Sequence, residues 1–280
     1  PWVADFRDPW FEEPPEAGTP PTVHWGSRIL ERRAVSAANR VVASTRQLHE
    51  QLAARYPEQP ATKFTTILNG YDEADFTNLP ELSRQNDAMT IVHAGMLNSE
   101  FRDPRPLFSA LRQAADEGFI DLAKVRLRFI GAGEFGDSES VRLSIAANGL
   151  ASAVAFTARM PYQAALTELA GADMLLLLQA SADTVGLVPA KLYEYLRLQK
   201  PVLALVQPGA SAELLAETEG GGWCVDPSDN AGLRDVLTEA YREWTADALS
   251  QRRAPLERLS RFERRALAGE LAGIFNELVV

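Results

Sequence analysis

The sequence predicts an α/β protein made of two units, each with a parallel β-sheet covered by helices. Short, almost wholly apolar runs alternate with segments of helical length along most of the 280 residues, which is typical of parallel strands joined by helices. A polar stretch without periodicity, residues 71–88, interrupts this alternation. With 46% hydrophobic residues, the chain can bury the cores of two such units.

The first unit begins with an apolar run at residues 1–6, which predicts a strand. Residues 11–22 are rich in proline, which interrupts helix and sheet alike, so we expect a loop there. The pattern then predicts a helix at 24–39, a strand at 40–45, a helix at 46–56 capped by Thr45, and a strand at 63–70. This order is that of a parallel sheet.

The second unit repeats the alternation to its end. The predicted strands are residues 89–95, 125–133, 153–159, 173–180, 201–206 and 222–226, and the predicted helices are 106–118, 140–149, 162–172, 190–199 and 212–220. Residues 230–280 have helical spacing throughout. We therefore predict domains at 1–82 and 83–258 and a C-terminal helix at 259–280 that crosses back to the first domain.

Composition narrows the classes of function. A formal charge of -10 argues against nonspecific nucleic-acid binding, which needs a basic surface. The single cysteine, Cys224, excludes an internal disulfide and is expected to be buried. The three histidines are too scattered to indicate a metal site, and no apolar run approaches the ~20 residues of a membrane span. The opening residues show neither an initiator methionine nor a signal peptide, so we interpret the chain as one started part-way.

The strongest candidate site lies at the start of the predicted helix 190–199. Gly186 and Pro189 predict a turn followed by a helix start, whose free backbone N–H groups attract phosphate. Lys191 and Glu194 follow at i, i+3 spacing on one helical face, which offers a cation for a diphosphate and a carboxylate for a sugar diol. This pattern suggests a nucleotide-sugar site. The alternative is an ordinary surface ion pair.

Eight segments, taken together and in order, resemble the glycosyltransferase family 4 enzymes, especially those of capsule and cell-surface polysaccharide assembly. They are VADFRDPW, RVVASTRQLHEQL, ILNGYDEADF, IVHAGML, LRFIGAGE, AFTARMPYQAAL, ADMLLLL and GLVPAKLYEYLRLQKPVLAL. The resemblance implies the GT-B architecture, in which two Rossmann-like domains face a cleft. Because relatives carry further βα units before the first of these segments, it also implies an N-terminally shortened chain with an incomplete first domain and a complete second one.

The resemblance also implies an activity. Such enzymes transfer sugar from a nucleotide-diphosphate donor, here of UDP or GDP type, with retention of anomeric configuration and without a metal or other cofactor. The acceptor would be a saccharide or a lipid-linked saccharide. The implied location is cytoplasmic, at the inner face of the membrane, with possible peripheral membrane association.

Glu194 matches the second acid of the family's E-x7-E motif, which in relatives holds the ribose hydroxyls; a carboxylate accepts hydrogen bonds from both. The first acid of that motif would fall at Gly186, so this sequence departs from the pattern. Asp183 or Thr184 could substitute from the same loop, although both are equally explained as solvated loop residues.

The resemblance assigns the distal phosphate to the backbone N–H groups of Leu187 and Val188, with Gly186 allowing close approach. It assigns the catalytic role, stabilisation of the leaving diphosphate, to Lys191 and Arg102. No protein nucleophile is evident.

Relatives place a basic pair after a strand-end glycine. Here that glycine is Gly95, but Met96 follows it, so one cation is missing and Arg102 is the best second candidate, with Arg105 in reserve. The alternative is that Arg102 simply pairs with Asp103.

Two further segments of the second unit belong to the expected site. Gly131 and Gly133 form a G-x-G that also fits a plain strand-to-helix turn. Arg159, Met160 and Tyr162 occupy the segment that holds the base in relatives, where Tyr162 could equally be a packing residue.

Asp5, Arg7 and Asp8 end the first strand, where α/β sheets place ligands, although a buried ion network is an equal alternative.

The leading hypothesis is therefore a retaining glycosyltransferase whose activity as this shortened chain is in question. A noncatalytic nucleotide-sugar-binding or scaffold protein is the alternative from another class, supported by Gly186 and Met96. A nucleotide-sugar 2-epimerase shares the architecture and would need acid and base carboxylates that the sequence does not identify.

Overall fold

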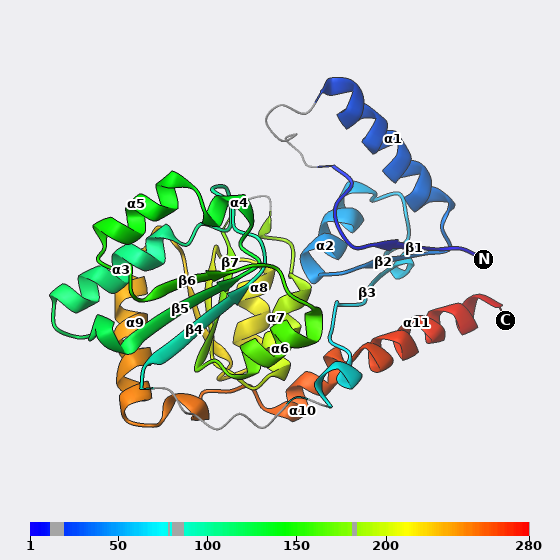
Figure 1. The fold of residues 1–280 in the computed structure, drawn as a ribbon. Helices are drawn as coiled ribbons and strands as arrows, with labels where there is room; N and C mark the ends of the chain where they lie inside the picture. The colour runs from blue at the N-terminus through cyan, green and yellow to red at the C-terminus, as the bar shows by residue number, and fades with distance from the viewer. Residues whose placement is uncertain (12–19, 78, 80–86, 181–183, 280) are drawn as a thin grey trace.

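The fold is that of a computed structural model, which describes residues 1–11, 20–77, 79, 87–180 and 184–279. The described residues form a smaller and a larger α/β unit, joined by extended segments and by a long C-terminal helix (Figure 1). This is the predicted fold class.

The smaller unit holds a three-stranded parallel sheet in the order β1-β2-β3, made of β1 (Val3–Phe6), β2 (Arg40–Ala43) and β3 (Phe64–Thr66). The helices α1 (Pro21–Ala37) and α2 (Arg46–Arg55) connect these strands, and Thr45 caps α2 by accepting the N–H of Leu48. Their apolar faces pack on the sheet and form the core of this unit.

The larger unit holds a six-stranded parallel sheet in the order β6-β5-β4-β7-β8-β9. Its strands are β4 (Met89–Ala94), β5 (Val125–Ile130), β6 (Val154–Thr157), β7 (Met174–Gln179), β8 (Val202–Val206) and β9 (Gly222–Val225). The connecting helices are α3 (Arg105–Asp116), α4 (Gly133–Gly136), α5 (Glu139–Ala147), α6 (Tyr162–Ala170), α7 (Ala190–Arg197), α8 (Ala210–Glu217) and α9 (Asn230–Thr245).

Both faces of the larger sheet are covered, because alternate residues of its central strands enter two different cores. Leu176 and Leu178 pack with α3, α5 and α9 on one face, whereas Leu175 and Leu177 pack with α6, α7 and α8 on the other. The strand order reverses between β4 and β7. In open α/β sheets, ligands bind at the carboxyl ends of the strands that flank such a reversal.

Two stretches of chain cross between the units, and they meet side by side. Tyr71 donates its N–H to the carbonyl of Phe262 at 3.1 Å, and its own carbonyl accepts the N–H of Arg264 at 2.8 Å. A Cβ on Gly70 would collide with the Phe262 carbonyl, so only glycine allows this approach.

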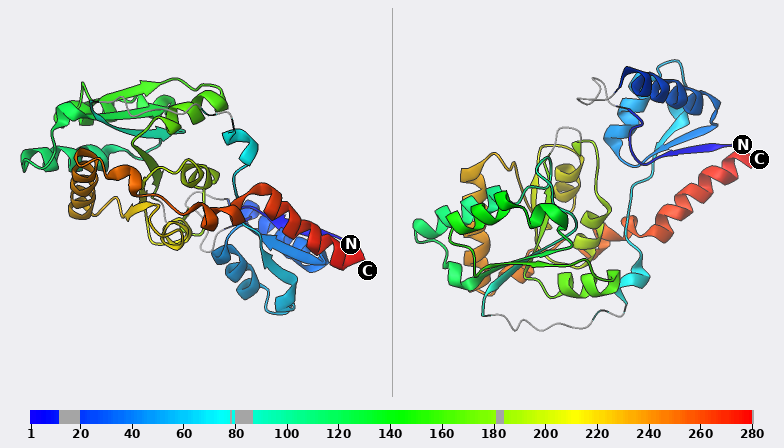
Figure 2. Two further views of the ribbon diagram at one scale, coloured as in Figure 1. Left: turned by 90° about the horizontal axis from the view of Figure 1, so that it is seen from below. Right: turned by 45° about the horizontal axis from the view of Figure 1, so that its top comes forward.

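The C-terminal helix α11 (Arg264–Val279) runs from the larger unit to the smaller one, and the two ends of the described chain lie side by side in all views (Figures 1 and 2). Its Leu267 and Ile274 pack against Val42 and Ile67 of the smaller unit. None of the described helices is long and apolar enough to cross a membrane.

The structure corrects three expectations. Residues 230–280 are not one helical stretch: α9 is followed by the short helices at Leu249–Gln251, Leu256–Leu259 and Ser260–Phe262 before α11 begins. Within the polar stretch 71–88, Glu73–Phe76 forms a 3₁₀ helix, because Tyr71 and Phe76 bury their rings in the core of the larger unit. Cys224 is exposed, since it lies on the edge strand β9.

Candidate functional site

The candidate residues of the larger unit gather at the carboxyl ends of β4 and β7, where the strand order reverses. Gly95 follows β4 directly, Arg102 lies in the loop after it, and Lys191 and Glu194 lie on α7, the helix that follows β7. The sequence placed Gly95 at a strand end and Lys191 and Glu194 at a helix start, and the strand order brings these segments together.

Lys191 lies over Gly95. Its Nζ donates to the carbonyl of Ala94 at 2.7 Å, and a Cβ on Gly95 would lie 2.5 Å from that nitrogen. Burial and the nearby charge of Arg102 together lower the pKa of Lys191 to about 8, although Glu194 partly opposes the shift. The positive charge of Lys191 is therefore only partly balanced by negative groups, and a bound anion would stabilise it.

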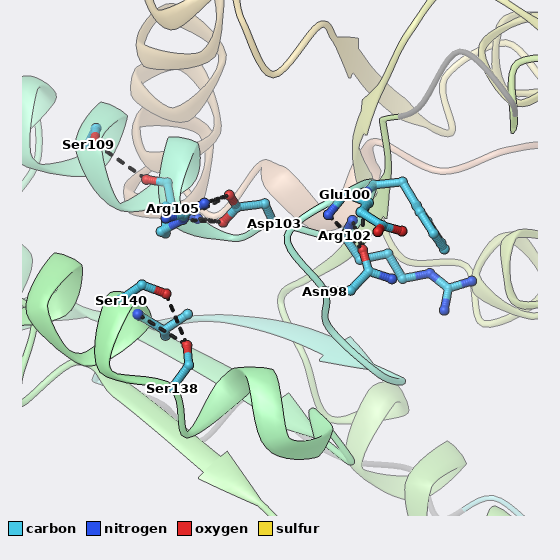
Figure 3. Close-up of polar contacts among 10 residues, drawn as sticks. Asn98, Glu100, Arg102, Asp103, Arg105, Ser109, Ser138 and Ser140 are labelled. Carbon is cyan, nitrogen blue, oxygen red and sulfur yellow. Dashed lines mark hydrogen bonds and ion pairs between the residues drawn. The ribbon is translucent and has the colours of Figure 1, made fainter. Parts of the chain in front are cut away.

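Arg102 is the second cation, and it does not pair with Asp103, the partner that the sequence suggested as an alternative. Asp103 is held by Arg105, whose Nε lies 2.9 Å from Oδ1 and 2.8 Å from Oδ2 of the carboxylate (Figure 3). The Arg102 guanidinium points away from Asp103 and lies 4.9 Å from the ring centroid of Phe101. Within the described ranges it contacts no carboxylate. Pairing of Arg102 with Asp103 is therefore wrong, and Arg105 is the arginine engaged.

His93 was not anticipated as part of the site. It is fully buried on β4, its Nδ1 lies 2.8 Å from the carbonyl of Leu176, and its Nε2 has no partner among the described residues. Burial, with the positive charges of Lys191 and Arg102, lowers the pKa of His93 to about 3, so the ring is neutral. A polar residue inside the apolar run 89–95 was the signal available in the sequence.

Glu194 on α7 is hydrogen-bonded to Tyr162 at the start of α6. The Tyr162 hydroxyl lies 3.0 Å from Oε1 of Glu194 and 3.4 Å from Oδ2 of Asp75. Burial and these two carboxylates raise the pKa of Tyr162, so the phenol stays protonated and donates. The ring is 46% exposed, which leaves it accessible to a ligand. Asp75 comes from the polar stretch that the sequence analysis took for a linker.

The loop between β7 and α7 lies beside these charges. The N–H of Leu187 donates to the carbonyl of Thr184 at 3.0 Å, so it closes a turn and does not face outward as the sequence suggested. The N–H groups of Gly186 and Val188 donate to no acceptor among the described residues. Pro189 caps α7 without a side-chain bond, and the first N–H groups of the helix have no intrahelical acceptor. Asp183 lies outside the described residues.

The loops after β5 and β6 border the same edge of the sheet. Gly131, at φ +68°, approaches the backbone of Arg159, whose Cα would lie 3.7 Å from a Cβ on the glycine. Gly133 similarly approaches the side chain of Met96. Arg159 is exposed, whereas Met160 packs against the larger unit's core.

In the smaller unit, Arg7 and Asp5 form a surface ion pair with Nη2 and Oδ2 2.7 Å apart, and Arg7 also donates to Asn69 at 3.1 Å. Asp8 is exposed and belongs to no ion pair among the described residues. The buried three-member ion network is therefore wrong, because these side chains lie at the exposed end of β1.

Residues of both units also line an open cavity of about 360 Å³. Thr45, Tyr193, Glu213 and Arg261 are among its lining residues, and Val188 is the one candidate residue that borders it. Lys191, Arg102 and Glu194 do not line it. Among the described residues, no three His, Cys, Asp or Glu side chains are grouped to hold a metal ion.

Solved structures with the same fold include glycosyltransferases. HepE from Anabaena, in complex with UDP and glucose, has 18% identity and a TM-score of 0.72 over 99% of this chain and 72% of its own. A glycosyltransferase from Rickettsia africae has 16% identity and a TM-score of 0.68 over 90% and 67% of the two chains. The pneumococcal O-GlcNAc transferase GtfA, in complex with UDP and GlcNAc, has 15% identity and a TM-score of 0.65 over 91% and 48%.

No protein-family model and no curated protein sequence matches the chain. At such identities the structural likeness establishes the fold. The chain has the α/β GT-B fold that HepE and GtfA share.

Proposed function

We propose that this protein is a glycosyltransferase that binds a nucleotide-diphosphate sugar at the carboxyl ends of β4 and β7. The observation that carries the proposal is the convergence of Lys191 and Arg102, two cations that pair with no carboxylate among the described residues. They lie beside the start of α7, which has no side-chain cap. One turn after Lys191 on the same helix, Glu194 offers a carboxylate to a ribose diol. The fold likeness to HepE, which was solved with UDP, supports a nucleotide-linked donor.

In the proposed reaction, the bond between the anomeric carbon and the diphosphate oxygen breaks, and a bond to the acceptor's hydroxyl oxygen forms. The acceptor hydroxyl loses its proton to the departing diphosphate. Lys191, Arg102 and the free N–H groups stabilise the negative charge that develops on the leaving group. Since these groups are fixed before the substrate arrives, little reorganisation opposes the reaction.

The finer features rest on the sequence resemblance. They are retention of configuration, hexosyl transfer, independence from metals and other cofactors, and a UDP- or GDP-linked donor. The acceptor is proposed to be a saccharide or a lipid-linked saccharide in surface polysaccharide synthesis, reached on the cytoplasmic side of a membrane with peripheral membrane association.

A noncatalytic nucleotide-sugar-binding protein is the second candidate, and the observation that favours it concerns Gly186. Where relatives have an acid near the donor sugar, this chain has a glycine whose carbonyl accepts the hydroxyl of Thr45 from the smaller unit at 2.7 Å. Because glycine has no side chain, residue 186 supplies no carboxylate to the sugar.

Calorimetry and a turnover assay test the proposal and separate the two candidates. The chain is titrated with UDP and GDP, and UDP- and GDP-sugars are followed for transfer to saccharides and for hydrolysis. Binding with turnover supports the enzyme, binding without turnover supports the binding protein, and 2-epimerised sugar would identify an epimerase. No binding of either nucleotide would overturn the site.

Glu194→Ala provides the internal check on the site. Loss of hydrogen bonds to a charged acceptor should weaken nucleoside-diphosphate binding by about 1–3 kcal/mol. Inorganic pyrophosphate, which has no ribose, should bind the variant and the wild type equally. Unchanged nucleotide affinity would remove Glu194 from the site.

A further inference from the structure

The loop Thr184–Val188 has its carbonyl oxygens turned inward. The carbonyl of Val185 accepts the N–H of Ala210 at 2.7 Å, and that of Gly186 accepts the Thr45 hydroxyl at 2.7 Å. The carbonyls of Thr184 and Leu187 also accept hydrogen bonds from within the protein. Four successive carbonyls are therefore bound on the protein side of the loop.

Gln179 is the centre of this arrangement. It is the last residue of β7 and is buried, and its Nε2 lies 3.0 Å from the carbonyl of Thr184 and 3.2 Å from that of Leu187. Its Oε1 accepts the hydroxyl of Ser211 at 2.8 Å, and that hydroxyl also lies 3.0 Å from the Leu187 carbonyl. One amide group and one buried hydroxyl thus set the conformation of the loop.

The inward carbonyls have an electrostatic consequence. A carbonyl oxygen that faced the ligand would repel a phosphate, whereas an N–H that faces it attracts the charge. With its carbonyls held inward, the loop leaves the N–H groups of Gly186 and Val188 for an anion at the start of α7. Because the bonds exist without ligand, the orientation is set before binding.

We propose that Gln179 and Ser211 are positioning residues that orient the loop Thr184–Val188 so that its N–H groups meet the distal phosphate of the donor. This inference rests on the proposed function and extends it to two residues that need not touch the substrate. Neither residue belongs to the motifs that suggested the site.

The test uses Gln179→Leu, which keeps the side chain's approximate volume and removes both polar groups, together with Ser211→Ala. Thr218→Ala is the matched control. Ser211 lies at the start of α8, and Thr218, which is also buried, follows the end of that helix. The Thr218 hydroxyl donates to the carbonyl of Leu215, which is not part of the loop. Affinities are measured by calorimetry for the nucleoside diphosphate that the wild type prefers, for the corresponding monophosphate, and for inorganic pyrophosphate.

Gln179→Leu should weaken the nucleoside diphosphate and pyrophosphate about tenfold and leave the monophosphate within twofold, because only the distal phosphate meets the loop. Ser211→Ala should produce a smaller loss with the same selectivity, and Thr218→Ala no loss. Equal losses for monophosphate and diphosphate, or no loss for Gln179→Leu, would overturn the positioning role.

A second measurement separates this inference from the proposed function. Amide hydrogen exchange of residues 184–188 in the ligand-free protein should accelerate in Gln179→Leu and not in Thr218→Ala. If the wild type binds no nucleotide, the proposed function fails while the exchange result still reports on the loop. If the wild type binds nucleotide and exchange in Gln179→Leu is the same as in the wild type, the positioning role of Gln179 is refuted and the proposed function stands.

Discussion

The ammonium group of Lys191 occupies the space that a side chain on Gly95 would need. A Cβ at residue 95 would lie 2.5 Å from Nζ, and the backbone there has φ +132°, a conformation that favours glycine. The glycine at the end of β4 thus leaves room for the ammonium group of Lys191 on α7, so the position of the lysine depends on the glycine.

Gly95→Ala is therefore expected to displace Lys191 and to weaken nucleoside-diphosphate binding about tenfold, or about 1.4 kcal/mol. Gly118→Ala is the control, because Gly118 also has a positive φ of +79° but has open space around its Cβ position. It should lose stability and keep its affinity. Equal binding by the two variants in calorimetry would contradict the coupling of Gly95 and Lys191.

Binding of a diphosphate should depend on pH through Lys191, whose pKa is about 8. As the pH rises from 7.5 to 9, most of the ammonium in the free protein loses its proton, so affinity should fall several-fold. Lys191→Arg, which stays charged, should show little of this fall and corrects for any titration of the nucleotide base. If affinity falls equally with pH in the wild type and in Lys191→Arg, titration of Lys191 is not the cause of the fall.

The same shift affects folding with a defined sign. Below about pH 8, Lys191 is charged in both states and the full cost of burying its charge is present. Above it, the unfolded state binds more protons than the folded state, so this contribution to the free energy of unfolding rises with pH until about 10.5. Denaturant titrations over this pH range should show this rise in the free energy of unfolding for the wild type, and Lys191→Met should lack it.

Thr45 joins the two units and should contribute more to stability than an ordinary cap. Its hydroxyl accepts from Leu48 N–H and donates to the carbonyl of Gly186, whereas Ser138 caps α5 by accepting from Val141 and otherwise contacts only the nearby Ser140 hydroxyl, at 3.1 Å, among the described residues. Ser138→Ala should cost about 1 kcal/mol in the free energy of unfolding. Thr45→Ala should cost roughly 1 kcal/mol more, because the interunit bond is lost as well. Chemical denaturation measures both, and equal losses would show that the interunit bond contributes nothing.

Two neighbouring buried tyrosines should respond oppositely to loss of the hydroxyl. The Tyr193 hydroxyl has no hydrogen-bond partner among the described residues, whereas that of Tyr195 accepts the N–H of Ala94 at 3.2 Å. Tyr193→Phe should be neutral or slightly stabilising, and Tyr195→Phe should cost about 1–2 kcal/mol because it leaves a backbone N–H unpaired. Thermal denaturation that ranks them in the reverse order would contradict this assignment.

The sequence predicted the strands and helices well, because each strand of the parallel sheets is a short apolar run with a helix behind it. It also located Gly95, Arg102, Lys191 and Glu194 near strand ends. Their convergence follows from the strand order, which apolar periodicity does not encode. The assignment of these residues to a donor remains a prediction.

Other features could not be read from the chain because they depend on contacts between distant segments. The sequence suggested Arg102 as the partner of Asp103, and only the path of the loop brings Arg105 to that carboxylate. The hydrogen bond from Tyr162 to Glu194 and that from Thr45 to Gly186 span 32 and 141 residues. The breaks after α9 were missed because its helical spacing continues through residues that turn.

The pairing of Tyr71 with Phe262 and Arg264 bonds the two crossings between the units to each other. Because they are bonded there, a relative movement of the two units would have to bend both crossings together. A protease that cut one crossing would leave the units joined by the other. The connection between the two halves therefore does not depend on a single stretch of backbone.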